Sequence, residues 1–436
     1  MSSILLTAIP LDGHVRPMLE VGRALVDAGH SIRFLTGVAY AEEVEAIGAV
    51  HVALPESADI TAAMLDAGRE RDGRRLSGIR GAIDNTRRNF IETLPGWMDA
   101  IDAEIDGGVH AIVGDGTVFA LGMVCARPRG SRPPIIACGF FPVVLLSRDA
   151  APPMLGLAPR SDAIGRLRNR LLNAVVTKVV FRGLQREADA VALERTGRRL
   201  PTFLTDWPRA AERFVQFSVP SFEYPRSDAP DSLVFVGRLG AHTSTAPLPS
   251  WWPDLDEADL VVHVSQGTLA NRDFDELIRP TVRALADRPG VLVVVSTGGR
   301  PESDVGPVPR NVRVASMLDY ERLMPSVDVF VTNGGYGSLT AALAHGVPVV
   351  AAGDTEEKVE TCARVAWSGV GIDLRTGTPD DDDVDRAVRR VLEDPRYRRA
   401  AERIRDEIRT APGKRGLLDA VEAVLAPARP PGASGG

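Results

Sequence analysis

The sequence has little cysteine, no long hydrophobic run and no excess of basic residues. Its three cysteines, Cys125, Cys138 and Cys362, are far apart and form no CxxC pair. That spacing excludes a disulfide framework and favours a reducing cytoplasm. No apolar run reaches the length of a membrane-spanning helix, and the start SSILLTAIP lacks the basic region of a signal peptide. We therefore expect a cytoplasmic globular protein without stable membrane insertion.

The charge balance bears on possible partners. The chain has 51 basic and 58 acidic residues, which gives a net charge of −7. An acidic balance argues against nucleic acid as a partner. With 436 residues, the chain is long for one hydrophobic core, so two domains are expected.

In the first half of the sequence, short buried strands alternate with helical stretches, which indicates a parallel α/β sheet. We predict a helix at 18–28 and strands at 4–8, 31–35, 111–113 and 135–137. Residues 161–197 have a helical pattern, with apolar positions every three or four residues and arginines on a polar face. We expect this polar face to be solvated and not to bind nucleic acid.

The alternation of strands and helices restarts after a turn-rich, proline-rich stretch at 220–253 that contains one strand, 233–236. We predict a helix at 274–286 and strands at 260–264, 291–296 and 312–315. The expected organisation has two Rossmann-like domains, residues 1–219 and 254–412, with 220–253 as the linker. Residues 413–436 are expected to form a helix that could return to the first domain, followed by a disordered tail.

The most informative stretch of the sequence is 328–374. An apolar strand at 329–331 runs into a glycine-rich turn at 333–338 and then into a helix of small residues. Glycines let the backbone approach a phosphate, and the first N–H groups of the helix point at it, so an anion site is predicted. The turn is not GxGxxG and no acidic ribose ligand follows at the expected distance, so a plain dinucleotide-binding domain fits poorly.

Two residues at strand ends in the first half are candidates for acid–base chemistry. His14 follows the first strand, Gly13 permits a tight turn there, and a helix N-terminus favours the neutral imidazole that a general base needs. Asp115 follows another strand of the same sheet and could hydrogen-bond the far ring nitrogen, which would fix the tautomer. Taken alone, His14 could equally be a capping or buried structural histidine, and Asp115 an ordinary Asx-turn residue.

Two further groups in the second half carry polar side chains. Residues 265–268, Ser-Gln-Gly-Thr, end a strand with hydroxyls that suit phosphate oxygens, although a turn and helix cap explains them equally well. Residues 354–358 offer carboxylates and an amine for sugar hydroxyls, but they nearly fit a capping box. We interpret His30, His51 and His263 as structural. No cluster of residues has metal-ligand spacing.

Together these groups resemble the family 1 glycosyltransferases of the GT-B fold, in particular the bacterial natural-product branch, over nearly the whole chain. The resemblance rests on GHxxP at 13–17, on 222–226 leading to 235–237, on 265–268, and on 332–371 with its Gly-Val-Pro at 346–348. It implies two facing Rossmann-like domains with an interdomain cleft, the first domain for the acceptor and the second for a nucleotide sugar. It further implies inverting, metal-independent and cofactor-independent transfer of a sugar to a hydroxyl of a small lipophilic acceptor, in natural-product or antibiotic biosynthesis.

The resemblance also implies roles for individual residues. His14 matches the catalytic base and Asp115 its carboxylate partner. We expect apolar loops with Phe119, Phe140 and Phe141 to line the acceptor pocket. The donor-binding positions are Gly13, Ser265, Gly267, Thr268, Met317, Leu318, Asn333, Gly335, Tyr336, Gly337, Ser338, Glu357 and Lys358.

Four departures from the family pattern concern the donor. Asn333 stands where histidine is usual, Met317 where tryptophan often packs under the base, Ala341 where a glutamate binds the ribose, and Lys358 where glutamine is usual. The nucleotide therefore stays open between UDP and TDP. A sugar-nucleotide epimerase and a non-catalytic sugar-nucleotide-binding auxiliary protein are the alternatives, and the chain is expected to be a monomer or a homodimer.

Overall fold

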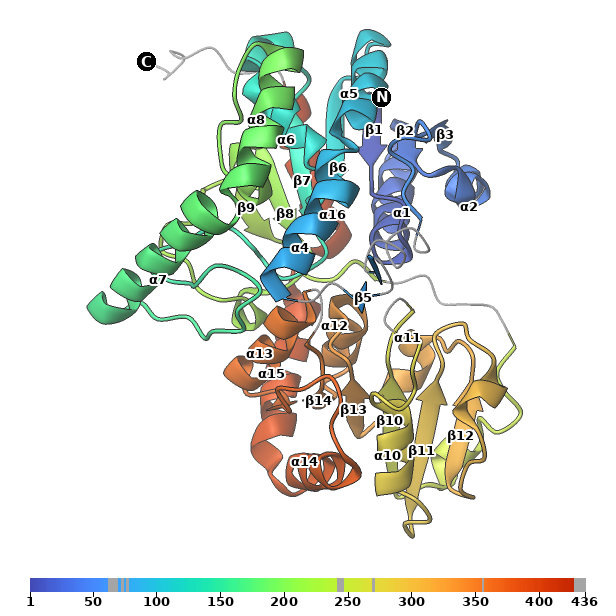
Figure 1. Cartoon of the computed structure of the whole chain (residues 1–436). Helices are drawn as coiled ribbons and strands as arrows, with labels where there is room; N and C mark the ends of the chain where they lie inside the picture. Colours follow the sequence, from blue (N-terminus) through green and yellow to red (C-terminus); the bar gives the residue numbers. More distant parts are fainter. Residues whose placement is uncertain are drawn as a thin grey trace, which may run out of the picture.

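The computed structural model describes residues 1–61, 70–71, 74–75, 78–240, 247–268, 271–354 and 357–426. The predicted tail beyond residue 426 lies outside the described residues, as do Thr355 and Glu356 of the predicted acidic loop. Two α/β domains lie one above the other in Figure 1, the first in blue to green and the second in yellow to orange. None of the helices in the described ranges is both long and apolar enough to cross a membrane.

The first domain is built on a seven-stranded parallel sheet in the order β3-β2-β1-β6-β7-β8-β9. Alternate residues along each strand face opposite sides of the sheet: Leu5 packs into one core, and Ile4 and Leu6 into the other. Helices α5, α6 and α8 cover the first side, and α1, α2 and α16 cover the second. The strands are β1 (Ser3–Thr7), β2 (Ser31–Thr36), β3 (Val50–Ala53), β6 (Ala111–Asp115), β7 (Ile135–Gly139), β8 (Arg213–Gln216) and β9 (Leu233–Phe235).

The helices of the first domain are α1 (Asp12–Asp27), α2 (Ala41–Ala46), α4 (Gly78–Thr86), α5 (Leu94–Asp106), α6 (Ala120–Ala126), α7 (Ala163–Val175), α8 (Arg182–Thr196) and α16 (Gly413–Leu425). A π-helical turn, η4 (Val176–Val180), joins α7 to α8. The short strands β4 (Glu70–Arg71) and β5 (Arg74–Arg75) form a separate two-stranded ribbon.

The second domain has a six-stranded parallel sheet in the order β12-β11-β10-β13-β14-β15. Its strands are β10 (Leu260–Ser265), β11 (Val291–Ser296), β12 (Val312–Ala315), β13 (Val329–Thr332), β14 (Val349–Ala351) and β15 (Gly371–Asp373). Its helices are α9 (Asp254–Glu257), α10 (Ile278–Ala284), α11 (Tyr320–Leu323), α12 (Tyr336–Ala344), α13 (Lys358–Ser368), α14 (Asp381–Glu393) and α15 (Pro395–Thr410). Two Rossmann-like sheets were predicted, and the topology confirms them.

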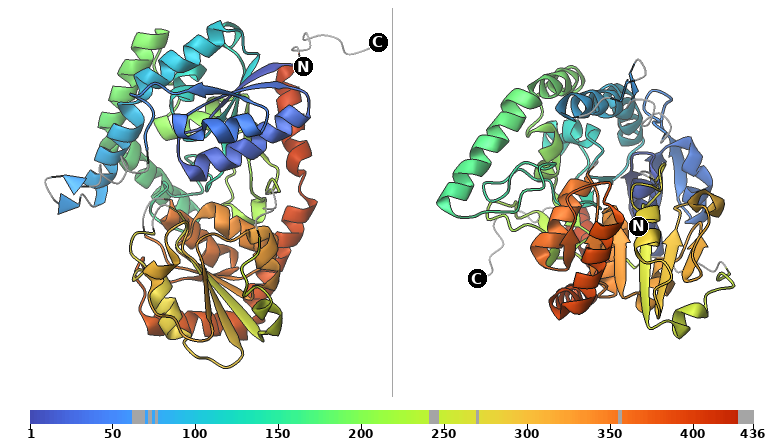
Figure 2. Two further views of the ribbon diagram at one scale, coloured as in Figure 1. Left: turned by 90° about the vertical axis from the view of Figure 1, so that its right-hand side faces the viewer. Right: turned by 60° about the horizontal axis from the view of Figure 1, so that its bottom comes forward.

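Two segments differ from a simple division of the chain at residues 220–253. Strand β9, inside the predicted linker, is an edge strand of the first sheet and pairs with β8. Helix α16 leaves the second domain and packs against α1 and β8 of the first, where Lys414 Nζ lies 2.7 Å from Asp27 Oδ2. Figure 2 (left) shows the C-terminal helices in red running from the lower domain to the upper one. The first domain therefore includes chain from both sides of the second.

Two helices begin elsewhere than their periodic stretches indicate. Helix α1 begins at Asp12, six residues before the periodic stretch 18–28 and two before His14, which was predicted to lie at the helix N-terminus, and it includes Pro17. Packing overrides the low helix propensity of proline there, because Val15 and Met18 are fully buried. Helix α10 begins only at Ile278, because the Gln266 side chain accepts from the Ile278 N–H and donates to the Asp273 carbonyl, which holds the preceding residues in a turn.

The core of the second domain contains one histidine whose titration should affect stability. His263 in β10 is fully buried, its Nδ1 lies 2.9 Å from the Val294 carbonyl oxygen, and its ring stacks on Phe330. Burial lowers the pKa of His263 from 6.5 to about 4. The unfolded chain binds a proton near pH 6.5, whereas the folded chain does so only near pH 4. The stabilising contribution of neutral His263 is therefore complete above pH 6.5 and falls by about 3 kcal/mol toward pH 4.

We expect His263→Phe to flatten the fall of the thermal midpoint between pH 7 and pH 4.5, because phenylalanine keeps the stacking and does not titrate. Thermal unfolding across a pH series measures this slope. His110→Phe, a change at a histidine outside the core, is the control and should leave the slope as in the wild type. Equal slopes in the wild type and His263→Phe would assign the pH dependence to other groups.

Candidate active site

The candidate site lies where the strand order of each sheet reverses. From the central strands β1 and β6 the following helices, α1 and α6, go to opposite faces of the first sheet. In the second sheet, β10 and β13 are the corresponding central pair. Ligands of open parallel sheets bind beyond the carboxyl ends of strands at such a switch point. His14 and Asp115 belong to this edge of the first sheet, and Ser265 and Asn333 to this edge of the second.

The carboxyl ends of the two sheets face each other. Gln216 is the last residue of β8, and Tyr336 opens the helix that follows β13. Their side chains meet across the domain interface, with Gln216 Nε2 3.5 Å from the Tyr336 hydroxyl. The glycine turn of the second domain therefore opens toward the edge of the first domain that carries His14 (Figure 1).

The structure brings His14 and Asp115 together. His14 Nδ1 lies 2.7 Å from Asp115 Oδ2; the carboxylate is fully buried and the imidazole is 22% exposed. With Nδ1–H donating to this carboxylate, the lone pair of a neutral imidazole resides on Nε2. This tautomer is the one that accepts a proton from a substrate hydroxyl, and the buried charge stabilises the imidazolium that results.

A third residue, Thr117, completes this arrangement and was missed from the sequence. Its hydroxyl donates to Asp115 Oδ2 over 2.7 Å, and its backbone N–H donates to Asp115 Oδ1 over 3.0 Å. The sequence signal was present as Asp-x-Thr, in which the aspartate side chain accepts from the backbone two residues on. Thr117 therefore orients the carboxylate that orients His14.

We expect Thr117→Val to lower kcat by about tenfold while leaving the KM for the donor unchanged, because valine keeps the shape and removes one hydrogen bond to a charged group. Thr117→Ser keeps that hydrogen bond and should retain wild-type kcat. Steady-state kinetics of the two variants measures the difference. If the valine and serine variants have the same kcat, Thr117 acts through packing alone.

The glycine turn after β13 has a rigid backbone. Gly334 has φ +91°, a conformation that favours glycine, and a side chain there would meet Cys362 Sγ at 2.7 Å. The Asn333 side-chain amide donates to the Gln266 carbonyl, which ties the turn to the segment after β10. The first N–H groups of α12, which follows Gly335, have no acceptor within the helix. The turn can thus present N–H groups to an anion.

The segment after β10 lies beside this turn. Ser265 is nearly buried and its hydroxyl accepts from the Gly267 N–H over 3.2 Å, whereas Thr268 is exposed. A side chain at Gly298 would lie 1.9 Å from the Gly267 carbonyl oxygen, so the turns after β10 and β11 pack backbone against backbone. Of the two predicted phosphate-binding hydroxyls, the one on Thr268 is therefore the more open.

The other predicted donor-binding residues differ in the solvent exposure of their side chains. The Tyr336 ring is buried and its hydroxyl donates to Glu223 Oε1 over 2.7 Å, so only its backbone is placed for a phosphate. The Ser338 hydroxyl donates to the Gly335 carbonyl. Lys358 opens α13, is 5% exposed and packs on Gly334, and Glu357 is half-buried beside it. Met317 and Leu318 follow the carboxyl end of β12, and Gly337 lies in α12 after β13. The Met317 side chain is exposed, and Leu318 packs against a core.

Gly13 and Ala341 both lie inside helices, in α1 and α12. Gly13 was predicted to permit a tight turn, and this was wrong: it lies within α1 without a positive φ. A side chain at Gly13 would meet nothing within 4 Å, so the glycine leaves open space at the start of the helix. Ala341, at the position where the family has glutamate, is buried within α12.

The three predicted acceptor-side phenylalanines do not lie together. Phe141 lies beside His14, with ring centroids 6.3 Å apart, and it also approaches Gly116. Phe140 stacks on Phe217 at 4.5 Å, and Phe119 packs against Phe90 in the core on the other side of the sheet. Phe141 is therefore the predicted acceptor residue that the structure places next to the His14 ring.

A buried ionic cluster joins the two domains and was also missed. Glu223, from the chain between the domains, accepts from Arg364 Nε over 3.1 Å, from the Tyr336 hydroxyl and from the Val143 N–H. Arg364 also pairs with Glu360 Oε2 at 3.0 Å, and its guanidinium lies 4.1 Å from the centre of the Tyr224 ring. Burial, and then the Glu223 charge, hold the pKa of Tyr336 well above 10, so its hydroxyl remains a donor.

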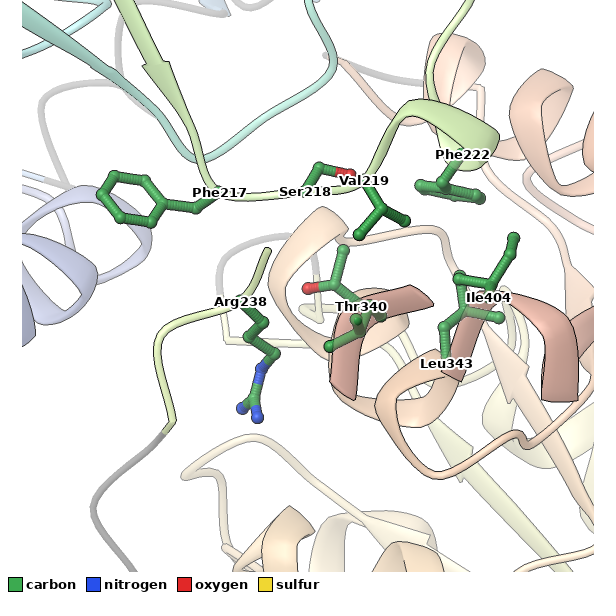
Figure 3. A pocket seen from close by; sticks show the side chains of 9 residues that line it. Phe217, Ser218, Val219, Phe222, Arg238, Thr340, Leu343 and Ile404 are labelled. Carbon is green, nitrogen blue, oxygen red and sulfur yellow. The ribbon is translucent and has the colours of Figure 1, made fainter. Parts of the chain in front are cut away.

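The same connection packs on the second domain through apolar side chains. Figure 3 shows Val219 and Phe222 above Thr340 and Leu343 of α12, with Ile404 of α15 close by. Val219 and Phe222 belong to the core formed by α12, α13 and α15. The sequence signal for this connection was the segment 222–226, whose glutamate and tyrosine are both buried in the structure.

Comparison with known proteins gives the family. Residues 285–424 match the family model described as "Erythromycin biosynthesis protein CIII-like, C-terminal domain". The chain is 40% identical to 4'-demethylrebeccamycin synthase of Lentzea aerocolonigenes, over 97% of this chain and 99% of that protein. It is 33% identical to UDP-glycosyltransferase 2 of Phaeomoniella chlamydospora, over 97% and 96% of the two chains.

A solved structure shows the same fold. The crystal structure of CalG4, the calicheamicin glycosyltransferase, matches with a TM-score of 0.73 at 22% identity, over 99% of this chain and all of that one. The GT-B fold predicted from the sequence is thereby confirmed. On the full-length identity to named relatives, this chain belongs to the family 1 glycosyltransferases, within the branch that modifies natural products.

Proposed function

We propose that this glycosyltransferase acts by direct inversion, with His14 as the base. The observation that carries the proposal is the 2.7 Å contact between His14 Nδ1 and the fully buried Asp115 carboxylate, at an edge that faces the glycine turn. A neutral histidine oriented in this way needs only an acceptor hydroxyl near Nε2 to act as a base. His14 lies on the first domain and the donor turn on the second, so each domain can hold one of the two substrates.

In this mechanism, the acceptor lies beside Phe141 with its hydroxyl toward His14. The proton passes to Nε2 while the hydroxyl oxygen attacks the anomeric carbon from the face opposite the diphosphate. The bond from that carbon to the diphosphate oxygen breaks, and its electron pair leaves with the nucleotide. The first N–H groups of α12 stabilise the charge that develops on the leaving group, and closure of the domains excludes water.

The donor is a UDP or TDP sugar and the acceptor a small lipophilic compound such as a polyketide or macrolide. The name of the relative from Phaeomoniella chlamydospora supports UDP. Asn333, Met317 and Ala341 depart from the family pattern at donor positions, so TDP is the alternative nucleotide. We place the reaction in the cytoplasm, where the three reduced cysteines would be stable. No metal ion or resident cofactor has a part in the proposed transfer.

The test begins with thermal shifts in UDP, TDP and their sugar conjugates, because a bound nucleotide raises the unfolding temperature. The stabilising donors are then incubated with a panel of lipophilic acceptors in the presence of EDTA. Mass spectrometry detects the glycosylated product, and proton NMR gives its anomeric configuration. A sugar nucleotide that changes without any acceptor would indicate an epimerase, loss of activity in EDTA would contradict metal independence, and a retained configuration would contradict inversion.

A further inference from the structure

Helix α7 exposes its apolar face to solvent and turns its polar face toward the protein. With the turn η4, it carries five large apolar residues at helical spacing, and all of them are half or more exposed, from Val175 at 50% to Ile164 at 72%. The pattern normally buries such a face in the core. We name as the apolar stripe Ile164, Leu167, Leu171, Val175 and Val179.

Polar side chains fill the opposite face, which holds the helix on the protein. The Asn169 amide donates to the Arg148 and Arg160 carbonyls, and the Asn173 amide donates to the Ser147 carbonyl. Arg166 Nε pairs with the buried Asp149 over 2.7 Å. The orientation is therefore built by specific hydrogen bonds, and the apolar stripe faces outward because the polar residues are used inward. Figures 1 and 2 (right) show α7 extending from the body at the left edge.

The positive charge of residues 163–182 indicates what kind of surface would cover the apolar stripe. Residues 163–182 contain five basic residues and no acidic one, in a chain whose net charge is −7. Arg166 and Arg168 bond to the body of the protein, whereas Arg170, Lys178 and Arg182 are exposed. An apolar face flanked by cations is the pattern of a helix that lies in the surface of an anionic membrane, with its long basic side chains reaching the headgroups.

We propose that α7 and η4 dock this glycosyltransferase on an anionic lipid bilayer. The apolar stripe enters the boundary between headgroups and acyl chains, and Arg170, Lys178 and Arg182 contact the lipid phosphates. A second copy of the chain is a poorer occupant, because stripe-to-stripe packing would bring two sets of cations together without any acidic residue in 163–182 to pair with them. The consequence is that a lipophilic acceptor could be taken from the membrane in which it dissolves. This consequence rests on the proposed acceptor class, but the docking itself does not.

The test is co-sedimentation of the full chain with vesicles of phosphatidylcholine alone and with vesicles that contain equal parts of phosphatidylglycerol. We expect binding to the anionic vesicles that weakens at high salt. Leu167→Gln with Leu171→Gln should lower the partition coefficient at least about tenfold through lost apolar burial. Glutamine retains helix propensity and both leucines are mostly exposed, so the unfolding temperature should stay near that of the wild type.

A separate variant tests the charge. Arg170→Gln with Lys178→Gln should lower binding to the anionic vesicles about 30-fold. The matched controls are Leu248→Gln, an exposed leucine outside the stripe, and Arg386→Gln with Arg415→Gln, two exposed arginines on other helices. These controls should bind as the wild type does.

Three results would overturn the proposal. The first is failure of the wild type to sediment with anionic vesicles. The second is equal loss of binding in the controls and in the stripe variants. The third is a dimer in sedimentation velocity that Leu167→Gln with Leu171→Gln converts to monomer without any effect of lipid, which would make the stripe an interface between copies. None of these readouts uses glycosyl transfer, so failure of membrane docking can be distinguished from failure of the proposed function.

Discussion

Replacement of His14 by alanine is expected to lower kcat by about two to four orders of magnitude, the usual size of a general-base effect. The imidazole is held by Asp115 at 2.7 Å, and alanine removes the group that we propose takes the proton of the acceptor hydroxyl. The Kd for the nucleotide sugar should remain near the wild-type value, because His14 belongs to α1 and the glycine turn belongs to the other domain. Catalysis and donor binding should therefore separate in this variant.

Single-turnover rates and calorimetric titration of the nucleotide measure the two quantities. The matched control is His110→Ala, a histidine that precedes β6 at the opposite edge of the same sheet and accepts from the Ser3 N–H. This control should keep wild-type turnover. Near-normal turnover in His14→Ala would remove the histidine from the mechanism and favour a different base.

Replacement of Arg364 by alanine is expected to destabilise the protein by about 3–5 kcal/mol, because it leaves two buried carboxylates without their cation. Arg364 and Glu223 are each 1% exposed, and Glu360 is 7% exposed. The same loss would release Glu223 from its position between Tyr336 and the Val143 N–H. We therefore expect weaker donor binding in addition to lower stability, since Tyr336 opens the helix whose N–H groups we propose as the phosphate site.

Urea unfolding monitored by tryptophan fluorescence measures the loss, and Trp367 on α13 is one reporter close to the cluster. Arg386→Ala on α14 is the matched control, because this arginine is 67% exposed and pairs with a neighbour on its own helix. An exposed pair of this kind contributes at most about 0.5 kcal/mol. A similar small loss for Arg364→Ala would mean that the cluster contributes little net stability.

The architecture was predictable because its signals are local. The strand 291–296 is a buried apolar run bounded by turn residues, and 312–315 is a short strand interrupted only by Arg313; the structure places both as predicted. The glycine turn at 333–338 needs glycine for its backbone, as Gly334 with its positive φ confirms. His14 and Asp115 could be proposed as partners because the carboxyl ends of parallel strands share one edge of a sheet.

Other features could not be predicted because they depend on what packs against a residue. Tyr336 was predicted on the donor side from its place in the glycine turn, but its side chain is buried on Glu223, 113 positions away in the sequence. Thr117 became a candidate only when its hydroxyl was seen on Asp115. In the 161–197 stretch, the periodicity predicted helix correctly, but it could not tell that Asn169 and Asn173 would face inward.

The sequence by itself thus determined the fold class, since backbone periodicity and glycine conformations are local properties. Its motifs determined the family. The tertiary structure decided which of the predicted side chains lie together at the strand edges and which are buried between the domains. It also decided that the apolar stripe of α7 faces solvent, because amide hydrogen bonds to the loop at Ser147 and Arg148 anchor the polar side of the helix. Hydrogen-bond partners distant in sequence set that orientation, and no local pattern contains them.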